Sequence, residues 1–185
     1  MQDERVERIL EAVSALSEEQ RQRLLRRLMK EYGLPVQESF PLAFETAQLD
    51  GPADYVVIFD GGSQGNPGAA YGSYHLTRTV DERSRLVRLD FEREMTNNEA
   101  EYQTLIAALE GLIGRIEAAG RDPGTFTVEV RGDSALVLHQ VEGTWKAKDD
   151  RMRGLRNRVR ELLACFKAHR LVLQGREESV RLLGH

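Results

Sequence analysis

Three acidic residues stand out because of the sequence around them. Asp60 follows the apolar run YVVIF at residues 55–59 and opens a glycine-rich turn, Asp133 ends the run TVEVRGD, and Glu101 lies within TNNEAEY. A β-branched, apolar run favours a buried strand, so the acid that follows it lies where the strand leaves the core. Carboxylates that converge from separate elements repel one another, and a bound divalent cation commonly relieves that repulsion. The pattern therefore predicts Mg²⁺-assisted phosphoryl transfer.

Four segments together carry a family resemblance. They are FDGGSQGNPG at residues 59–68, TNNEAEY at 96–102, GDSALVLHQVEGTWKAK at 132–148 and a weaker LVLQGREES at 171–179. In residue type, order and spacing they resemble ribonuclease H of type one and its bacterial reverse-transcriptase-like branch. The resemblance implies an α/β fold with a mixed five-stranded sheet flanked by helices, and an endonuclease that cleaves the RNA strand of RNA–DNA hybrids.

The resemblance also implies a two-metal active site. Asp60, Glu101 and Asp133 would be both catalytic residues and metal ligands, with Asp60 bridging two Mg²⁺ ions and the other two acids holding the ion nearer the leaving group. Mn²⁺ is an alternative to Mg²⁺. Two such ions, about 3.5–4 Å apart, stabilise the attacking water and the leaving oxygen of an in-line displacement. Family spacing selects Glu101 over Glu99, which we expect to face solvent.

Four further residues are implied to contact the substrate: Asn66, Thr96, Asn98 and Ser134. The asparagines would face sugar edges and phosphates of the RNA strand, and the threonine would help to form a pocket for a DNA phosphate. Glu94 weakens that pocket, because relatives often carry a basic residue at its position. The alternative for Asn66 is a tight turn with Pro67 and Gly68.

The segment WKAK at residues 145–148 resembles a Trp-Lys-x-Lys segment of the bacterial branch. Trp145 would cover a sugar face while Lys148, together with Lys146, meets backbone phosphates. As the only tryptophan of the chain, Trp145 is equally well interpreted as an anchor of the core.

The resemblance fails at the fourth acid of the family. Leu183 stands where an aspartate is expected, and that acid normally holds the ion that activates the attacking water. Glu177, Glu178 or His185 is a conceivable substitute. Two hypotheses follow: a hybrid-cleaving endonuclease with weakened activity, or a catalytically degenerate ribonuclease H-fold protein that binds nucleic acid or a protein partner.

Composition limits the remaining possibilities. The 185 residues suffice for one domain with a sizeable core and a small appendage, and the formal net charge of −4 argues against nucleic-acid binding through bulk positive charge. One cysteine cannot form an internal disulfide. No apolar run is long enough for a membrane span, and the start of the chain does not resemble a signal peptide. We therefore expect a cytoplasmic protein without membrane contact.

Periodicity divides the chain into three parts. Apolar residues at helical spacing predict a helical hairpin over residues 1–33, followed by a proline-containing linker at 34–52 and the ribonuclease H-like domain at 53–185. The hairpin packs on the domain or forms a homodimer, since its apolar stripes need a partner. Within the domain we expect strands near 55–60, 69–78, 84–93, 126–131 and 170–174, and helices near 97–118, 134–142 and 149–168.

Overall fold

The computed structural model describes residues 49, 51–175, 177 and 183. The predicted helical hairpin at 1–33, nearly all of the linker at 34–52 and any homodimer contact through the hairpin lie outside these residues. Their assignment remains a prediction.

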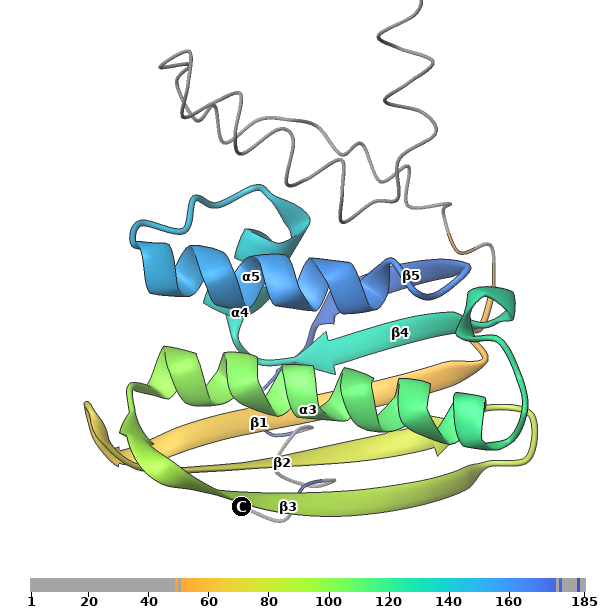
Figure 1. The fold of residues 1–185 in the computed structure, drawn as a ribbon, viewed down its shortest axis with the longest axis horizontal. Coiled ribbons are helices and arrows are strands. Elements are labelled where there is room, and N and C mark those ends of the chain that lie inside the picture. The colour runs from red at the N-terminus through yellow and green to blue at the C-terminus, as the bar shows by residue number, and fades with distance from the viewer. Residues whose placement is uncertain (1–48, 50, 176, 178–182, 184–185) are drawn as a thin grey trace, which may run out of the picture. The chain divides into compact units, whose positions relative to one another are not determined.

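A five-stranded sheet is built around β1 (Tyr55–Gly65). Strands β2 (Gly68–Arg78) and β3 (Arg83–Met95) follow antiparallel on one side, and β4 (Thr127–Gly132) and β5 (Ala168–Leu173) lie parallel on the other. The order is β3-β2-β1-β4-β5 (Figure 1). The predicted fold class, a mixed five-stranded sheet with helices, is confirmed for this part of the chain.

Three helices pack on the sheet and on one another: α3 (Asn97–Ala118), α4 (Ala135–Glu142) and α5 (Asp150–Leu163). A short 3₁₀ turn, η1, spans Pro123–Thr125. Each helix starts at a side-chain N-cap, because the preceding Thr96, Ser134 or Asp149 accepts a hydrogen bond from a first-turn backbone N–H. Helix α3 runs along β1 (Figure 1), which its buried leucines contact.

The core lies between the sheet and these helices. Its members come from alternate positions of the inner strands and from one stripe of each helix, as the periods of two and 3.6 residues require. Those that are almost fully buried include Val57, Phe59, Val128, Val130, Leu105, Leu109, Leu112, Val137, Val159 and Leu163. None of the described helices is long and apolar enough to cross a membrane.

Two element boundaries differ by five residues from the sequence-based expectation. Strand β1 continues five residues beyond position 60, because its pairing with β2 extends through the glycine-rich segment as far as Gly65 opposite Gly68. Helix α5 ends at Leu163 instead of near 168. The Lys167 backbone N–H donates to the Phe126 carbonyl at 2.8 Å, which returns the chain to the sheet.

Candidate active site

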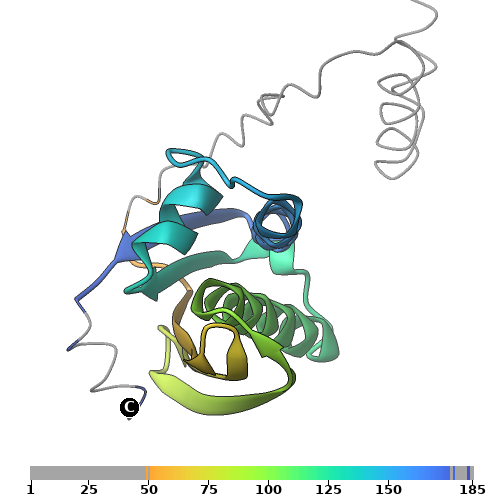
Figure 2. The ribbon, with the colours of Figure 1, turned by 90° about the vertical axis from the view of Figure 1, so that its left-hand side faces the viewer.

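Two of the predicted acids, Asp60 and Asp133, lie at the same end of the sheet. Strands β1 and β4 pair in parallel with Ile58 opposite Arg131, and continuing that register by two residues sets Asp60 opposite Asp133. Neighbouring strands lie about 4.7–4.9 Å apart. Asp60, within β1, therefore lies beside Asp133, the residue that directly follows β4. The carboxyl end of β4 is on the side that Figure 2 turns toward the viewer.

A glycine next to Asp60 lets the third acid, Glu101, come close to β1. A Cβ atom added to Gly61 would lie 2.6 Å from the backbone of Ala100 and Glu101, a separation that real Cβ atoms essentially never have. A Cβ at Gly132 would lie 2.6 Å from the Phe59 ring. Only glycine permits this closeness, so Gly61 lets the start of α3 lie against β1, and Gly132 leaves room for the Phe59 ring between β4 and β1.

The Glu101 carboxyl is electrostatically coupled to the other two acids. Its pKa is raised to about 7, mainly by burial and also by the charges of Asp133 and Asp60, while a hydrogen bond from Ser134 acts in the opposite direction. Ser134 Oγ donates to Glu101 Oε2 at 2.5 Å. Asp60 and Asp133 are thus near enough to influence Glu101, and Ser134 holds the Glu101 carboxyl.

The donor chemistry of this group fits a hard divalent cation, which prefers carboxylate oxygens. Among the residues that the structure describes, no three acidic, histidine or cysteine side chains form a cluster tight enough to hold a metal ion. The three candidate ligands therefore lie near one another without forming a closed coordination shell.

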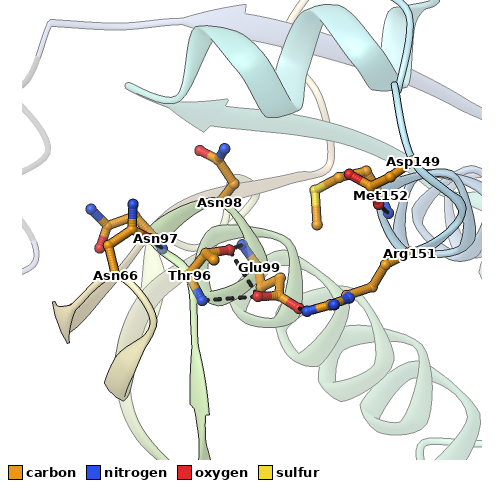
Figure 3. A pocket seen from close by; sticks show the side chains of 8 residues that line it. All are labelled: Asn66, Thr96, Asn97, Asn98, Glu99, Asp149, Arg151 and Met152. Carbon is orange, nitrogen blue, oxygen red and sulfur yellow. Dashed lines mark hydrogen bonds and ion pairs between the residues drawn. The ribbon is translucent and has the colours of Figure 1, made fainter.

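A cavity of about 420 Å³ opens beside the start of α3 (Figure 3). It brings together three of the predicted substrate-contacting residues, namely Asn66, Thr96 and Asn98. The other described residues that line it are Asn97, Glu99, Asp149, Arg151 and Met152. Most of its polar groups are amides and hydroxyls, which suit hydrogen bonding to sugars and phosphates.

Glu99 corrects the expectation that its side chain faces solvent. It is buried, accepting from Thr96 N–H at 2.9 Å and from Thr96 Oγ1 at 2.8 Å, and it pairs with Arg151 at 2.7 Å (Figure 3). Burial opposes ionisation, but the bonds from Arg151 and Thr96 outweigh it and lower the Glu99 pKa to about 2. The capping box therefore fixes Thr96 and connects α3 to α5.

Asn66 lies in the turn at the tip of the β1–β2 hairpin, which confirms the alternative prediction of a tight turn at this residue. Its side chain also reaches α3, where Asn66 Oδ1 accepts from Asn97 N–H at 3.3 Å. Asn97 Oδ1 in turn accepts from Ser63 N–H and from Ser63 Oγ, both at 2.8 Å. The hairpin tip is thereby fixed to the helix N-terminus at one side of the cavity.

Trp145 lies on the surface, half exposed, so its interpretation as a core anchor is wrong. Its ring packs on His139, with ring centroids 4.8 Å apart. Lys146 and Lys148 are exposed on the same loop, while Ala147 between them is buried. Neither Trp145 nor Lys148 lines the cavity.

At the fourth-acid position, Leu183 is helical and fully buried, whereas Glu177 is exposed. Apolar packing therefore occupies the position where the resemblance expects a carboxylate. The two other candidate substitutes, Glu178 and His185, lie outside the described residues.

The sequence analysis did not predict three of the residues that line the cavity, namely Asn97, Asp149 and Arg151. Asn97 could have been found as a neighbour of Asn98 at the helix start. Arg151 had no local signal, because its partner Glu99 lies 52 positions away in sequence. Glu94, which was expected to weaken a phosphate pocket, is exposed and does not line the cavity.

Residues 59–180 match the family described as reverse transcriptase-like. Ribonuclease HI of Halobacterium salinarum is 43% identical over 110 residues, which are 60% of this chain and 51% of that protein. A bifunctional protein of Mycobacterium tuberculosis is 35% identical over 120 residues, which are 60% of this chain and 29% of that protein. The chain thus spans about half of the first relative and less than a third of the second.

Solved structures agree with these matches. The crystal structure of RNase H1 from Halobacterium salinarum superposes with a TM-score of 0.56 and 35% identity, covering 69% of this chain and 90% of that one. LC11-RNase H1 in complex with an RNA/DNA hybrid gives a TM-score of 0.57 and 28% identity, with coverage of 69% and 90%.

The fold, the strand order and these matches define a ribonuclease H-type domain. The chain belongs to the reverse transcriptase-like family.

Proposed function

We propose that this chain is a metal-dependent endonuclease that cleaves the RNA strand of RNA–DNA hybrids, with Asp60, Glu101 and Asp133 as its catalytic carboxylates. The observation that carries the proposal is the coupling of Glu101 to the other two acids at one sheet edge. Carboxylates that converge on one place from separate elements repel one another, and a bound divalent ion relieves that repulsion.

Two Mg²⁺ ions, or Mn²⁺, would be held by Asp60, Glu101 and Asp133. When bound, such ions stabilise the charge on the attacking and leaving oxygens of a phosphodiester displacement. Ser134 orients the Glu101 carboxyl by donating to Oε2 and stabilises its charged form. That contact makes Ser134 a positioning residue in this proposal, beside its predicted substrate contact.

The substrate would lie across the edge and the adjacent cavity. Asn66, Thr96 and Asn98 line the cavity with groups that can reach sugar hydroxyls and phosphate oxygens. Trp145 offers an exposed aromatic face and Lys148 an exposed cation for the nucleic-acid backbone. The hybrid bound to LC11-RNase H1 supports the same class of partner for this chain.

A second candidate function rests on Leu183. Because this fully buried leucine occupies the position of the fourth acid, the ion that activates water would have fewer protein ligands. A domain with this defect would bind a hybrid or a protein partner without turnover.

A cleavage assay on a hybrid with a labelled RNA strand separates the two candidates. We expect cleavage with Mg²⁺ or Mn²⁺, and a loss of at least about 1,000-fold in Asp60→Asn, equivalent to about 4 kcal/mol of transition-state stabilisation. Asp90→Asn makes the same chemical change at an exposed position of β3 and should leave the rate unchanged.

Full activity of Asp60→Asn would contradict the catalytic assignment. Hybrid binding with no cleavage in either metal would favour the second candidate.

A further inference from the structure

A second cavity lies at the opposite end of β1 and α3 from the acids. It measures about 300 Å³ and is formed by the start of β1, the end of β2, the start of β3 and the last turn of α3. Tyr55 lies five residues before Asp60 on β1, a separation of about 16 Å at the rise of a strand. Figure 1 shows the two ends on opposite sides of the domain.

Five arginines line this cavity: Arg78, Arg83, Arg85, Arg115 and Arg121. No described residue that lines it is acidic. Asp81, just outside, pairs with Arg78 and Arg83. The wall of the cavity is thus strongly positive, although the whole chain carries a formal net charge of −4.

The floor of the cavity is apolar. It consists of Tyr55, Leu76, Leu112 and Ile116, of which all but Tyr55 are buried. Tyr55 packs edge-on against Phe126, with ring centroids 5.5 Å apart, and the Arg121 guanidinium lies 4.3 Å from the centre of the same Phe126 ring. The aromatic contact holds Arg121 beside the cavity.

An apolar floor under a cationic wall defines the chemistry of a ligand. Guanidinium groups bind phosphate through paired, charge-assisted hydrogen bonds. A ring or other apolar part would cover the floor, and a volume of about 300 Å³ is at the lower end of small-molecule sites. Gathering five arginines costs repulsion that a multiply charged anion would relieve.

We propose that this cavity is a second ligand site, separate from the carboxylate edge, that binds the phosphate of a nucleotide, either free or within a nucleic-acid strand. Arg85 and Arg115 are the principal phosphate contacts, since they reach the cavity from different elements and form no ion pair with another described residue. The site does not depend on hydrolysis at the acid edge.

The test is an NMR titration of the full ¹⁵N-labelled chain in EDTA, which keeps divalent ions from recruiting nucleotides to the acids. The probes are adenosine monophosphate, a ten-residue oligothymidylate and a heptaglutamate peptide. We expect amide shifts in residues 83–85 and 115–121 with the first two probes. Tighter binding of the monophosphate would assign a free nucleotide, and tighter binding of the oligothymidylate would assign a strand.

Matched variants distinguish a site from bulk charge. Arg85→Glu and Arg115→Glu should each weaken binding at least about fivefold, because each removes a charge-assisted contact and adds a repulsive charge. Arg88→Glu makes the same charge change at an exposed position of the same strand as Arg85, outside the cavity, and should alter binding less than about twofold. Dispersed spectra would verify that each variant is folded.

Three results would overturn the proposal. One is the absence of shifts around the cavity at millimolar concentrations of both phosphate probes. Another is equal weakening by Arg88→Glu, which would indicate unspecific attraction. The third is tighter binding of heptaglutamate than of either phosphate probe, which would indicate an acidic protein partner instead.

Discussion

The two ends of β1 and α3 carry opposite charges and are built by different means. At one end Asp60, Glu101 and Asp133 share a sheet edge, and at the other five arginines surround a cavity. The acids sit on short side chains, so their meeting depends on the close backbone approach at Gly61. The arginines have long side chains and reach a common cavity from separate elements without such an approach.

Both arrangements follow from the apolar interior between them. The middle of β1 and of α3 is buried against the core, where an unpaired charge would be costly. Charged groups therefore collect where the elements leave the core. This difference predicts that the structure of the acid end is sensitive to backbone geometry, whereas ligand binding at the arginine end responds mainly to changes in charge.

The substitution Gly61→Ala should have the largest effect and should act on the acid end. Its Cβ would lie 2.6 Å from the backbone of Ala100 and Glu101, so we expect a loss of about 2–4 kcal/mol in the free energy of unfolding. Urea denaturation measures this loss. Amide shifts should change near Glu101 and Asp133 more than near Arg78 and Arg85.

The matched control is Gly114→Ala within α3, where an added Cβ meets no heavy atom within 4 Å. Alanine is the better helix former, so this variant should gain up to about 1 kcal/mol. Equal stability of the two variants would show that the close approach at Gly61 is unimportant.

A fourth carboxylate at the acid end is tested by Leu183→Asp. If the site binds two ions, the added charge should raise Mg²⁺-dependent hybrid cleavage roughly tenfold, or about 1.4 kcal/mol. Because Leu183 is fully buried, the variant should lose about 2 kcal/mol of stability without metal, and Mg²⁺ should restore part of it. Cleavage assays and metal-dependent thermal unfolding measure both effects.

Leu183→Asn is the control of similar shape without a charge. A similar rise in cleavage in this variant, or no rise in Leu183→Asp, would contradict a role for the missing carboxylate.

The Glu99–Arg151 pair predicts a pH dependence of stability. The Glu99 pKa is lowered to about 2, so its stabilisation is complete above the unfolded-state pKa of about 4.5 and is lost as the pH falls toward 2. Because the Arg151 side chain is 73% exposed, solvent screening reduces the contribution to about 1–2 kcal/mol. Urea denaturation of Glu99→Gln should therefore differ from the parent at pH 7 and approach it near pH 2.5.

Glu94→Gln supplies the comparison, since Glu94 is an exposed acid near the same end of the sheet. A pH-independent deficit in Glu99→Gln would mean that packing, and not the charge of Glu99, stabilises the capping box.

The smallest effect is expected at the arginine end. Asp81 pairs with Arg78 and Arg83, so Asp81→Asn would release both guanidinium groups toward the cavity. Binding of adenosine monophosphate should strengthen by about twofold, since exposed ion pairs contribute little. Fluorescence or NMR titration measures the change, with Asp90→Asn as an exposed control on β3. Weaker binding in Asp81→Asn would mean that Asp81 orients the arginines.

Much of the domain could be predicted because its signals are local. The helix at 97–118 was predicted with its observed bounds, since Thr96 caps it and apolar residues repeat along it at helical spacing. The end of β1 could not, because the glycines after Asp60 favour a turn by themselves and become a strand only through pairing with β2.

The sequence by itself indicated which strand or helix lies at each of the three acids, and the order of the elements, although it did not indicate that β1 continues past Asp60. These properties depend on runs of neighbouring residues, which local propensity and apolar periodicity control. Only the tertiary structure decided that Glu99 is buried with Arg151, that Trp145 is exposed, and that five arginines from β2, β3, α3 and the loop after α3 share one cavity. Each of these depends on contacts between residues far apart in the chain, whose burial and pairing exist only once the sheet and helices have packed.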